Sequence, residues 1–226
     1  MNDELQTIYK NILTELGPGV ELVAVSKTKP VEAIRELYDL GQRDFGENYV
    51  QELADKQPQL PADIRWHFIG HLQSNKVKYI ASFVHLIHGV DSLRLLREIG
   101  KQAARYNRVI NCLLQVHIAR EETKFGLDAA ELDELMRTVR TTPLEFKHIR
   151  LGGLMGMASF TEDEEKVREE FKGLKILFDK YFGEAEASPG QHFYLSMGMS
   201  GDYKIAVREG SSMVRIGSLL FGKRGG

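Results

Sequence analysis

Residues 22–30 read Leu-Val-Ala-Val-Ser-Lys-Thr-Lys-Pro, an apolar run that ends in a basic turn without a glycine. The run has the length and the β-branched content of a buried strand. A doubly wound open sheet that binds a dinucleotide would be expected to carry a glycine-rich phosphate fingerprint in this first turn. The glycine-free turn at 26–30 therefore favours a barrel over an open sheet.

Seven further apolar runs follow, separated by longer segments with helical periodicity, and this alternation is typical of parallel βα units. The eight predicted strands cover residues 21–28, 43–47, 66–70, 86–90, 111–118, 150–158, 193–199 and 213–221. The clearest predicted helices cover residues 31–40, 92–106, 129–140 and 163–181, most of them introduced by Pro, Asp or Ser. Eight such units predict an α/β fold, a single-domain (β/α)8 barrel of the TIM type, with residues 3–16 as an extra N-terminal helix.

Composition restricts the class of protein. The 226 residues carry 30 basic and 32 acidic side chains, which gives no electrostatic reason to expect nucleic acid or an anionic membrane as a partner. No apolar stretch approaches the roughly 20 residues that span a bilayer. The only cysteine is Cys112, and the N-terminus lacks the pattern of a signal peptide. We expect one domain, residues 1–226, in the cytoplasm.

Lys27 is the first candidate functional residue because it ends the first predicted strand. Active sites of α/β barrels lie at the C-terminal ends of the strands. Partial burial there disfavours the ammonium form of a lysine, and the neutral amine can attack an aldehyde to form an imine. The structural alternative is a lysine that reaches the rim or pairs with a carboxylate. Lys29 lies on the same face of an extended strand, but its place beside Pro30 favours it as the solvated lysine of the two.

The ends of the seventh and eighth predicted strands carry small and hydroxyl-bearing residues. Ser200, Gly217 and Ser218 have the chemistry of a phosphate site, which barrels frequently build from the loops after these two strands. Small residues are also common in tight barrel turns for steric reasons alone.

Arg215 lies inside the otherwise apolar eighth strand, where an unpaired guanidinium would be costly. It must therefore meet an acceptor, and two kinds of acceptor are open. One is the ring nitrogen of a bound pyridine, which a permanent donor would keep unprotonated. The other is a structural carboxylate, such as Glu209 or Asp202.

Six ordered segments together resemble the pyridoxal phosphate homeostasis proteins, also called YggS-like or proline synthase co-transcribed proteins. The resemblance covers nearly the whole chain, and six ordered matches make it specific. The segments are AVSKTKP at 24–30, FGENYVQE at 45–52, WHFIGHLQSNK at 66–76, GLMGM at 153–157, LSMGMS at 195–200 and MVRIG at 213–217.

This resemblance implies a fold type III barrel that binds pyridoxal 5'-phosphate (PLP) and is shared with the N-terminal domain of alanine racemases. It implies that the first lysine of the Ser-Lys-Thr-Lys-Pro run, Lys27, carries PLP as a Schiff base. It also implies that Asn48 and His71 lie near the cofactor. By the same resemblance, the phosphate site is formed by Ser200, Gly217 and Ser218, and the ring nitrogen is contacted by Arg215.

The remaining polar and sulfur-containing residues are expected to have structural roles. The histidines at 67, 71, 85, 88 and 117 are spread over three strand regions without the spacing of a metal site. Cys112 is expected in the core, and the charged run 162–170 on a solvated helix face. The methionines at 155, 157, 197 and 199 follow strand alternation, which predicts core packing, with contact to a face of the cofactor ring as the alternative.

Two functions remain, a PLP carrier without strong turnover and a small PLP-dependent amino-acid racemase. A racemase needs bases on both faces of the substrate carbon, and in the racemases that the barrel resembles the second base is a tyrosine from an extra domain of a partner subunit. The chain stops after the eighth strand, so we expect no such domain, although Tyr49, Tyr194 or Tyr203 could substitute for it. The sequence therefore predicts a monomeric carrier that buffers PLP and delivers it to apo-enzymes.

Overall fold

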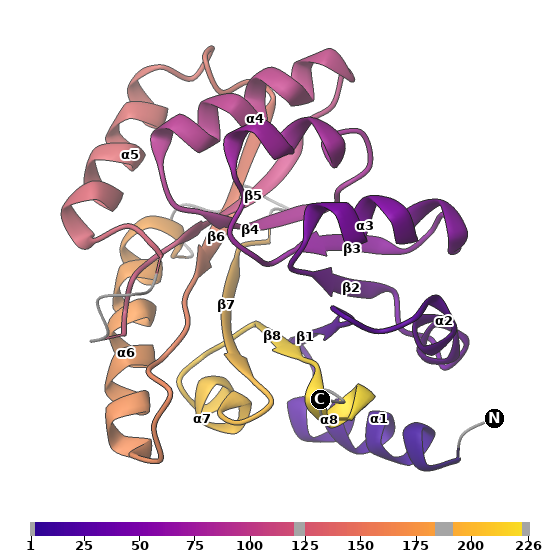
Figure 1. Ribbon diagram of the computed structural model, residues 1–226. Coiled ribbons are helices and arrows are strands. Elements are labelled where there is room, and N and C mark those ends of the chain that lie inside the picture. The colour runs from indigo at the N-terminus through magenta and orange to yellow at the C-terminus, as the bar shows by residue number, and fades with distance from the viewer. Residues whose placement is uncertain (1–2, 120–124, 184–191, 223–226) are drawn as a thin grey trace.

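Eight parallel strands close into a barrel in the computed structural model, which describes residues 3–119, 125–183 and 192–222 (Figure 1). Each strand pairs with the next one in the sequence, and β8 pairs with β1. The strands are β1 (Glu21–Val25), β2 (Asp44–Glu47), β3 (Arg65–Phe68), β4 (Leu86–Val90), β5 (Ile110–Gln115), β6 (Ile149–Met155), β7 (Tyr194–Met199) and β8 (Met213–Ile216). This is the predicted (β/α)8 fold.

Helices surround the barrel, and α1 precedes β1 as the predicted extra helix, packing beside α8 (Figure 1). The α-helices are α1 (Asp3–Leu16), α2 (Val31–Asp39), α3 (Val50–Lys56), α4 (Leu93–Arg105), α5 (Ala129–Thr141), α6 (Glu164–Phe182), α7 (Tyr203–Arg208) and α8 (Ser218–Phe221). Two 3₁₀ segments, η1 (Gln57–Gln59) and η2 (Ser74–Tyr79), complete the described elements. Among the helices of the described residues, none combines the length and the apolar character that crossing a bilayer requires.

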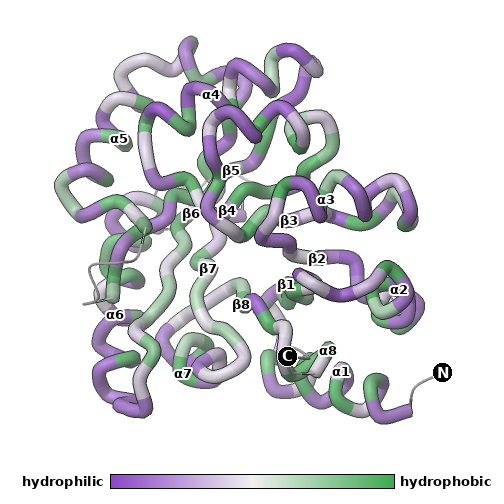
Figure 2. The backbone as a smooth tube through the Cα atoms, in the orientation of Figure 1, coloured by the Kyte–Doolittle hydropathy of each residue, from purple (hydrophilic) through white to green (hydrophobic). Residues whose placement is uncertain are grey.

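Two apolar clusters stabilise the barrel. The larger cluster lies between strands and helices, and it includes Ile34 and Leu37 of α2 and Phe171 and Leu174 of α6. These helices alternate between hydrophobic and hydrophilic residues along their length, as amphipathic helices do (Figure 2). The smaller cluster draws only on strands, which places it inside the barrel; its buried members are Val23, Leu86, Leu113, Met155 and Met213.

Several predicted strands end earlier in the structure than in the sequence analysis. The strand predicted at 21–28 ends at Val25, because Thr28 adopts a positive φ of 62° and the Lys29 N–H donates to the Ser26 carbonyl across a turn. The strand predicted at 213–221 ends at Ile216 because α8 begins at Ser218. Lys27 and Ser218 therefore lie in loops after their strands, where barrels place functional groups.

Predicted helices agree more closely with the structure, because their starts carry capping residues. Ser92 and Asp163 accept hydrogen bonds from the first turns of α4 and α6, and Asp128 forms a capping box with Glu131 at the start of α5. Each of these helices begins within one residue of its predicted start. The short helices α3 and α7 were not predicted because they offer less than two turns of periodicity.

Candidate functional site

A cavity of about 520 Å³ opens at the C-terminal ends of the strands. Loops after β1, β2, β6, β7 and β8 contribute to its wall, which is the usual place of an active site in an α/β barrel. Six of the seven residues that the sequence analysis placed at or near a cofactor line this one cavity: Lys27, Asn48, Ser200, Arg215, Gly217 and Ser218. Residues separated by up to 191 positions in the sequence are thus brought to a common space.

The loop that carries Lys27 is held by a buried charge cluster. Lys56 of α3 donates from Nζ to Glu47 Oε1 at 2.8 Å, to Glu52 Oε1 at 2.6 Å and to the Ser26 carbonyl at 2.9 Å. The Glu52 carboxylate in turn accepts the backbone N–H of Thr28 at 2.6 Å. These contacts fix the backbone on both sides of Lys27.

Glu47 is the most deeply buried member of this cluster, with no exposed surface. Its Oε1 accepts the Ser26 hydroxyl at 2.6 Å, whereas its Oε2 is buried without a hydrogen-bond partner in the described part of the chain. Burial raises the pKa of the Glu47 carboxyl, and the hydrogen bonds from Lys56 and Ser26 oppose that rise. The cluster is therefore sensitive to loss of its one lysine.

The loops after β7 and β8, beside the end of β1, have the features of an anion site. Ser200 Oγ accepts the backbone N–H of Gly217 at 3.3 Å, which links the loops after β7 and β8. A Cβ on Gly217 would lie 3.1 Å from the Val25 carbonyl oxygen, so a larger residue would crowd the first strand, and a Cβ on Gly201 would meet nothing within 4 Å. Backbone N–H groups and hydroxyls here can approach an anion closely.

Arg215 lies on the floor of the cavity and is 3% exposed. Its Nη1 donates to the Ser196 carbonyl at 2.8 Å and to Ser196 Oγ at 2.7 Å, and its Nη2 donates to the Gly156 carbonyl at 3.0 Å. A guanidinium has five N–H donors, so these contacts leave two for a molecule in the cavity. Burial lowers the pKa of Arg215 to about 10, which still leaves the group cationic at neutral pH.

The structural carboxylates considered for Arg215 do not pair with it in the described part of the chain. Glu209 accepts a hydrogen bond from Arg168 at 2.9 Å. Asp202 accepts the backbone N–H of Met199 at 2.6 Å and only raises the pKa of Arg215 through its charge. The direct partners of the guanidinium are therefore two carbonyls and one hydroxyl.

Asn48 and several apolar side chains complete the wall. Asn48 Oδ1 is buried and has no hydrogen-bond partner in the described part of the chain, so it offers an acceptor to a ligand. Met157 and Met199 line the cavity with Ile69, whereas Met155 and Met197 are fully buried in the core. Core packing is thus confirmed for Met155 and Met197 and in part for Met157, which also packs against the cluster inside the barrel, and contact with the cofactor ring stays a prediction.

His71 and Lys29 are placed differently from their predictions, although Lys29 does line the cavity. His71 is outside the cavity lining: its Nδ1 is 3.2 Å from Asp91 Oδ2, and its ring stacks on Phe125 at 4.1 Å between centroids. Lys29, expected to be solvated, is half-buried and donates to the Phe221 carbonyl at 2.8 Å. That bond ties the first loop to the C-terminal end of α8.

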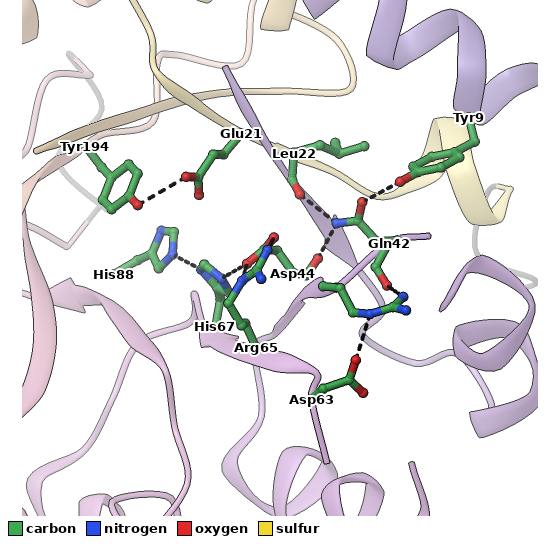
Figure 3. Close-up of polar contacts among 11 residues, drawn as sticks. Tyr9, Glu21, Leu22, Gln42, Asp44, Asp63, Arg65, His67, His88 and Tyr194 are labelled. Atoms are coloured by element: carbon green, nitrogen blue, oxygen red, sulfur yellow. Dashed lines mark hydrogen bonds and ion pairs between the residues drawn. The ribbon is translucent and has the colours of Figure 1, made fainter. Parts of the chain in front are cut away.

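None of the three tyrosines considered as a second base lines the cavity. Tyr194 lies at the opposite end of the barrel, where its hydroxyl donates to Glu21 at 3.1 Å and burial raises its pKa to about 12 (Figure 3). Tyr203 is 6% exposed, donates to Glu15 and also has a pKa raised to about 12 by burial. Tyr49 is 57% exposed beside α3.

The structure contains features that sequence reasoning missed. Three histidines described as scattered, at 67, 85 and 88, meet inside the barrel with ring centroids 5.2–5.5 Å apart. No group of His, Cys, Asp and Glu in the described residues is arranged to hold a metal ion. Glu170 belongs to the charged run predicted to be solvated, yet it is 8% exposed and accepts the Ser159 N–H and hydroxyl, which holds a cavity-lining loop. Glu170 follows Val167 by three residues and precedes Leu174 by four, so helical spacing places it on the buried face of α6, although its charge favoured a solvated position.

Fold and cavity together define a class of protein. The family model described as "Alanine racemase, N-terminal domain" matches residues 2–225, essentially the whole chain. Alanine racemase from Bartonella henselae has a TM-score of 0.70 with 17% sequence identity, covering 99% of this chain and 61% of that one, which is a likeness of fold alone.

Closer relatives identify the family within that class. A protein from Aquifex aeolicus named pyridoxal phosphate homeostasis protein is 42% identical over 205 residues, covering 90% of this chain and 87% of the relative. The Escherichia coli protein of the same name is 41% identical over 210 residues, covering 91% and 86%. The chain therefore belongs to the pyridoxal phosphate homeostasis protein family.

A solved structure of a relative adds a ligand to this comparison. PipY from Synechococcus elongatus, solved without PLP, has a TM-score of 0.88 and 34% sequence identity, covering 96% of this chain and all of that one. The same protein solved with PLP bound has a TM-score of 0.84.

Proposed function

We propose that this chain holds PLP as a Schiff base on Lys27 and acts as an intracellular carrier and buffer of PLP. The observation that carries the proposal is the convergence of Lys27, Arg215 and the Ser200–Gly217 loop pair on one cavity. The PLP-bound structure of PipY and the names of the relatives support it. When bound, PLP supplies an aldehyde carbon that an amine attacks and a ring that withdraws electrons.

The cavity has a place for each part of this cofactor. Ser200 with the backbone of Gly217 and Ser218 would bind the phosphate, where the absence of a side chain on Gly217 leaves room beside Val25. Asn48 Oδ1, buried without a partner, would accept a hydrogen bond from the cofactor or its attached lysine. The residues present therefore fit PLP.

Arg215 would contact the ring nitrogen with the donors that it does not use within the protein. Because a guanidinium cannot give up its proton at neutral pH, it keeps the ring nitrogen unprotonated. An unprotonated ring withdraws electrons weakly. This arrangement favours holding the cofactor over accelerating reactions at the carbon of a bound amino acid.

The positions of the three tyrosines considered as a second base also support the carrier function. Racemisation needs a base on each face of the substrate carbon, and none of Tyr49, Tyr194 and Tyr203 lines the cavity. Apo-enzymes that require PLP are the proposed recipients. The monomeric state and the cytoplasmic location stay predictions from the sequence.

The proposal is tested by the visible absorption band that a lysine Schiff base gives PLP. Purified wild-type protein mixed with PLP should show the band, and Lys27→Ala should lose it. Lys29→Ala is the matched control, because Lys29 lines the same cavity two residues away and is expected to keep the band. A band that survives Lys27→Ala, or that disappears only with Lys29→Ala, contradicts the assignment.

The absence of strong turnover is tested separately. PLP-loaded protein is incubated with single enantiomers of amino acids, and the opposite enantiomer is measured over time against free PLP at equal concentration. We expect the two rates to be similar. Steady formation of the opposite enantiomer well above the rate with free PLP would support the racemase function instead.

A further inference from the structure

A row of buried polar side chains lies inside the barrel next to Arg215 and takes no part in the proposed contacts with PLP. It consists of Ser196 on β7, His88 on β4, His67 on β3 and Asp44 on β2, each at most 7% exposed. Barrel interiors are filled mainly by apolar side chains, and burying polar groups is costly unless they are hydrogen-bonded. The row therefore calls for an explanation.

Its members form an unbroken series of hydrogen bonds away from Arg215. Arg215 Nη1 is 2.7 Å from Ser196 Oγ, which is 3.1 Å from His88 Nδ1. His88 Nε2 is 2.9 Å from His67 Nδ1, and His67 Nε2 is 3.0 Å from Asp44 Oδ1. Figure 3 shows the part of this series from His88 to Asp44.

The series ends at the barrel mouth opposite the cavity. Asp44 Oδ1 accepts from Arg65 Nε at 2.6 Å, and the Arg65 side chain is 48% exposed. Tyr194 and Glu21 are drawn in the same region (Figure 3). One polar path therefore connects the cavity floor with solvent at the other end of the barrel.

The groups at its two ends determine which atom donates and which accepts in each hydrogen bond of the series. Arg215 can only donate, so it donates to Ser196 Oγ, and the Ser196 hydroxyl donates to His88 Nδ1. His88 then carries its proton on Nε2 and donates to His67 Nδ1, and His67 donates from Nε2 to the Asp44 carboxylate. Burial lowers the pKa of His88 well below its ordinary value, in agreement with a neutral ring. Burial alone would raise the pKa of Asp44, but hydrogen bonds from His67 and Arg65 outweigh it and lower the pKa to about 2.

We propose that Ser196, His88, His67 and Asp44 are positioning residues that orient the Arg215 guanidinium toward the cofactor ring through one coupled series of hydrogen bonds. The inference rests on the proposed function, because Arg215 must face PLP for its orientation to matter. The direct partners of Arg215 are uncharged. The series connects the buried guanidinium of Arg215 to the Asp44 carboxylate through four hydrogen bonds.

A matched set of variants tests the series in the full-length protein. Ser196→Ala interrupts it beside Arg215, and Asp44→Asn removes the charge at its far end with little change in volume. Ser211→Ala is the control, because Ser211 is also a buried serine and its hydroxyl lies within hydrogen-bond distance of the Met197 carbonyl, at 2.8 Å, outside the series. Circular dichroism verifies that each variant is folded.

The readouts are the dissociation constant for PLP and the position of its visible band. We expect Ser196→Ala to weaken PLP binding about tenfold and to shift the band, because it removes a hydrogen bond to a charged group. Asp44→Asn should act in the same direction by a smaller factor, and Ser211→Ala should change neither quantity. The double variant should bind PLP no more weakly than Ser196→Ala alone, since the series is already interrupted. The inference would be overturned if the two single variants left the dissociation constant for PLP unchanged. It would also be overturned if the increase in the double variant equalled the product of the two single increases.

Nitrogen NMR of histidine-labelled protein without cofactor provides a test that does not depend on PLP. Both His67 and His88 should be neutral with the proton on Nε2, and Ser196→Ala should change the Nδ1 signal of His88. A cationic ring, or a proton on Nδ1 of either residue, would overturn the series. A wild-type protein without a Lys27-dependent band would instead contradict the proposed function.

Discussion

At the scale of single residues, Lys56 neutralises the carboxylates that hold the Lys27 loop. Its ammonium group is buried between Glu47 and Glu52 and also donates to the Ser26 carbonyl. A buried ion pair contributes little against a well-packed apolar replacement of both partners, but removing one partner leaves an uncompensated charge. The loop that presents Lys27 therefore depends on a lysine that does not itself line the cavity.

Lys56→Met should destabilise the protein by about 3 kcal/mol, because it leaves the Glu47 carboxylate buried without a cation. The measurement is the free energy of unfolding in urea. Lys175→Met is the control, since Lys175 pairs with Asp179 on the exposed face of α6 and such pairs contribute about 0.5 kcal/mol. Equal effects of the two variants would contradict a special role of the buried pair.

Sequence analysis could find charged residues that lie in or at the end of apolar runs. It could not find side-chain contacts that depend on the register between strands. Lys27 and Arg215 were predicted because each interrupts or ends an apolar run. The row that contains His67 and His88 was missed, because the two residues are 21 positions apart and only the register of β3 against β4 brings their ring nitrogens to 2.9 Å. Glu170 was missed for a different reason: its charge favoured solvent, although its spacing from Val167 and Leu174 places it on the buried face of α6.

At the scale of elements, the pairing of β6 with β7 depends on one glycine. Gly153 has a φ of 135°, which L side chains rarely adopt, and a Cβ there would lie 2.0 Å from the Tyr194 carbonyl oxygen. The two residues are register partners, and a shift in register lies just before Gly153 in the pairing of β5 with β6. The close approach of two backbones leaves no room for a side chain.

Gly153→Ala should therefore lower the free energy of unfolding by about 3 kcal/mol or prevent folding, through strain at a positive φ and overlap with β7. Gly152→Ala is a neighbouring control, because its Cβ would make an ordinary contact of 3.6 Å with Leu113. Urea unfolding of both variants measures the difference. A Gly153→Ala protein as stable as Gly152→Ala would contradict the geometry of the β6–β7 pair.

The number and order of the strands were predictable because hydrophobic periodicity indicates which side chains are buried. The exact ends of strands were not, because a strand that leaves the barrel continues to use apolar residues in the loop. Val116 to Ile118 and Gly156 to Ala158 illustrate this: both were predicted as strand and follow β5 and β6 as loops. Helices carry Ser or Asp caps that mark their starts, which explains the better agreement there.

At the scale of the whole molecule, the barrel interior makes stability depend on pH. Burial lowers the pKa of His85 from its ordinary 6.5 to about 4, and burial also lowers the pKa of His88 well below its ordinary value. The unfolded chain thus binds protons at these residues near pH 6.5, whereas the folded chain does not. Stability falls as pH falls through this window.

We expect the free energy of unfolding to decrease by up to about 1.4 kcal/mol per pH unit for each of these two histidines between about pH 6 and about pH 4.5. Asp44, with its folded-state pKa of about 2, should cause a further loss only below about pH 4. Urea unfolding at several pH values measures the slope. His85→Gln should flatten it, and the same change at the exposed His192 should not. A slope that is unchanged in His85→Gln would contradict the assignment.

The central claim is that Lys27 is the residue that binds PLP covalently, and peptide mapping tests it most directly. Protein mixed with PLP is reduced with borohydride, digested and analysed by mass spectrometry, with Lys29→Ala protein treated in parallel. The account predicts the mass of reduced PLP on the peptide that contains Lys27, with fragmentation placing it on that residue in both proteins. PLP found mainly on Lys29 or on another lysine, or no stoichiometric attachment at all, would contradict it.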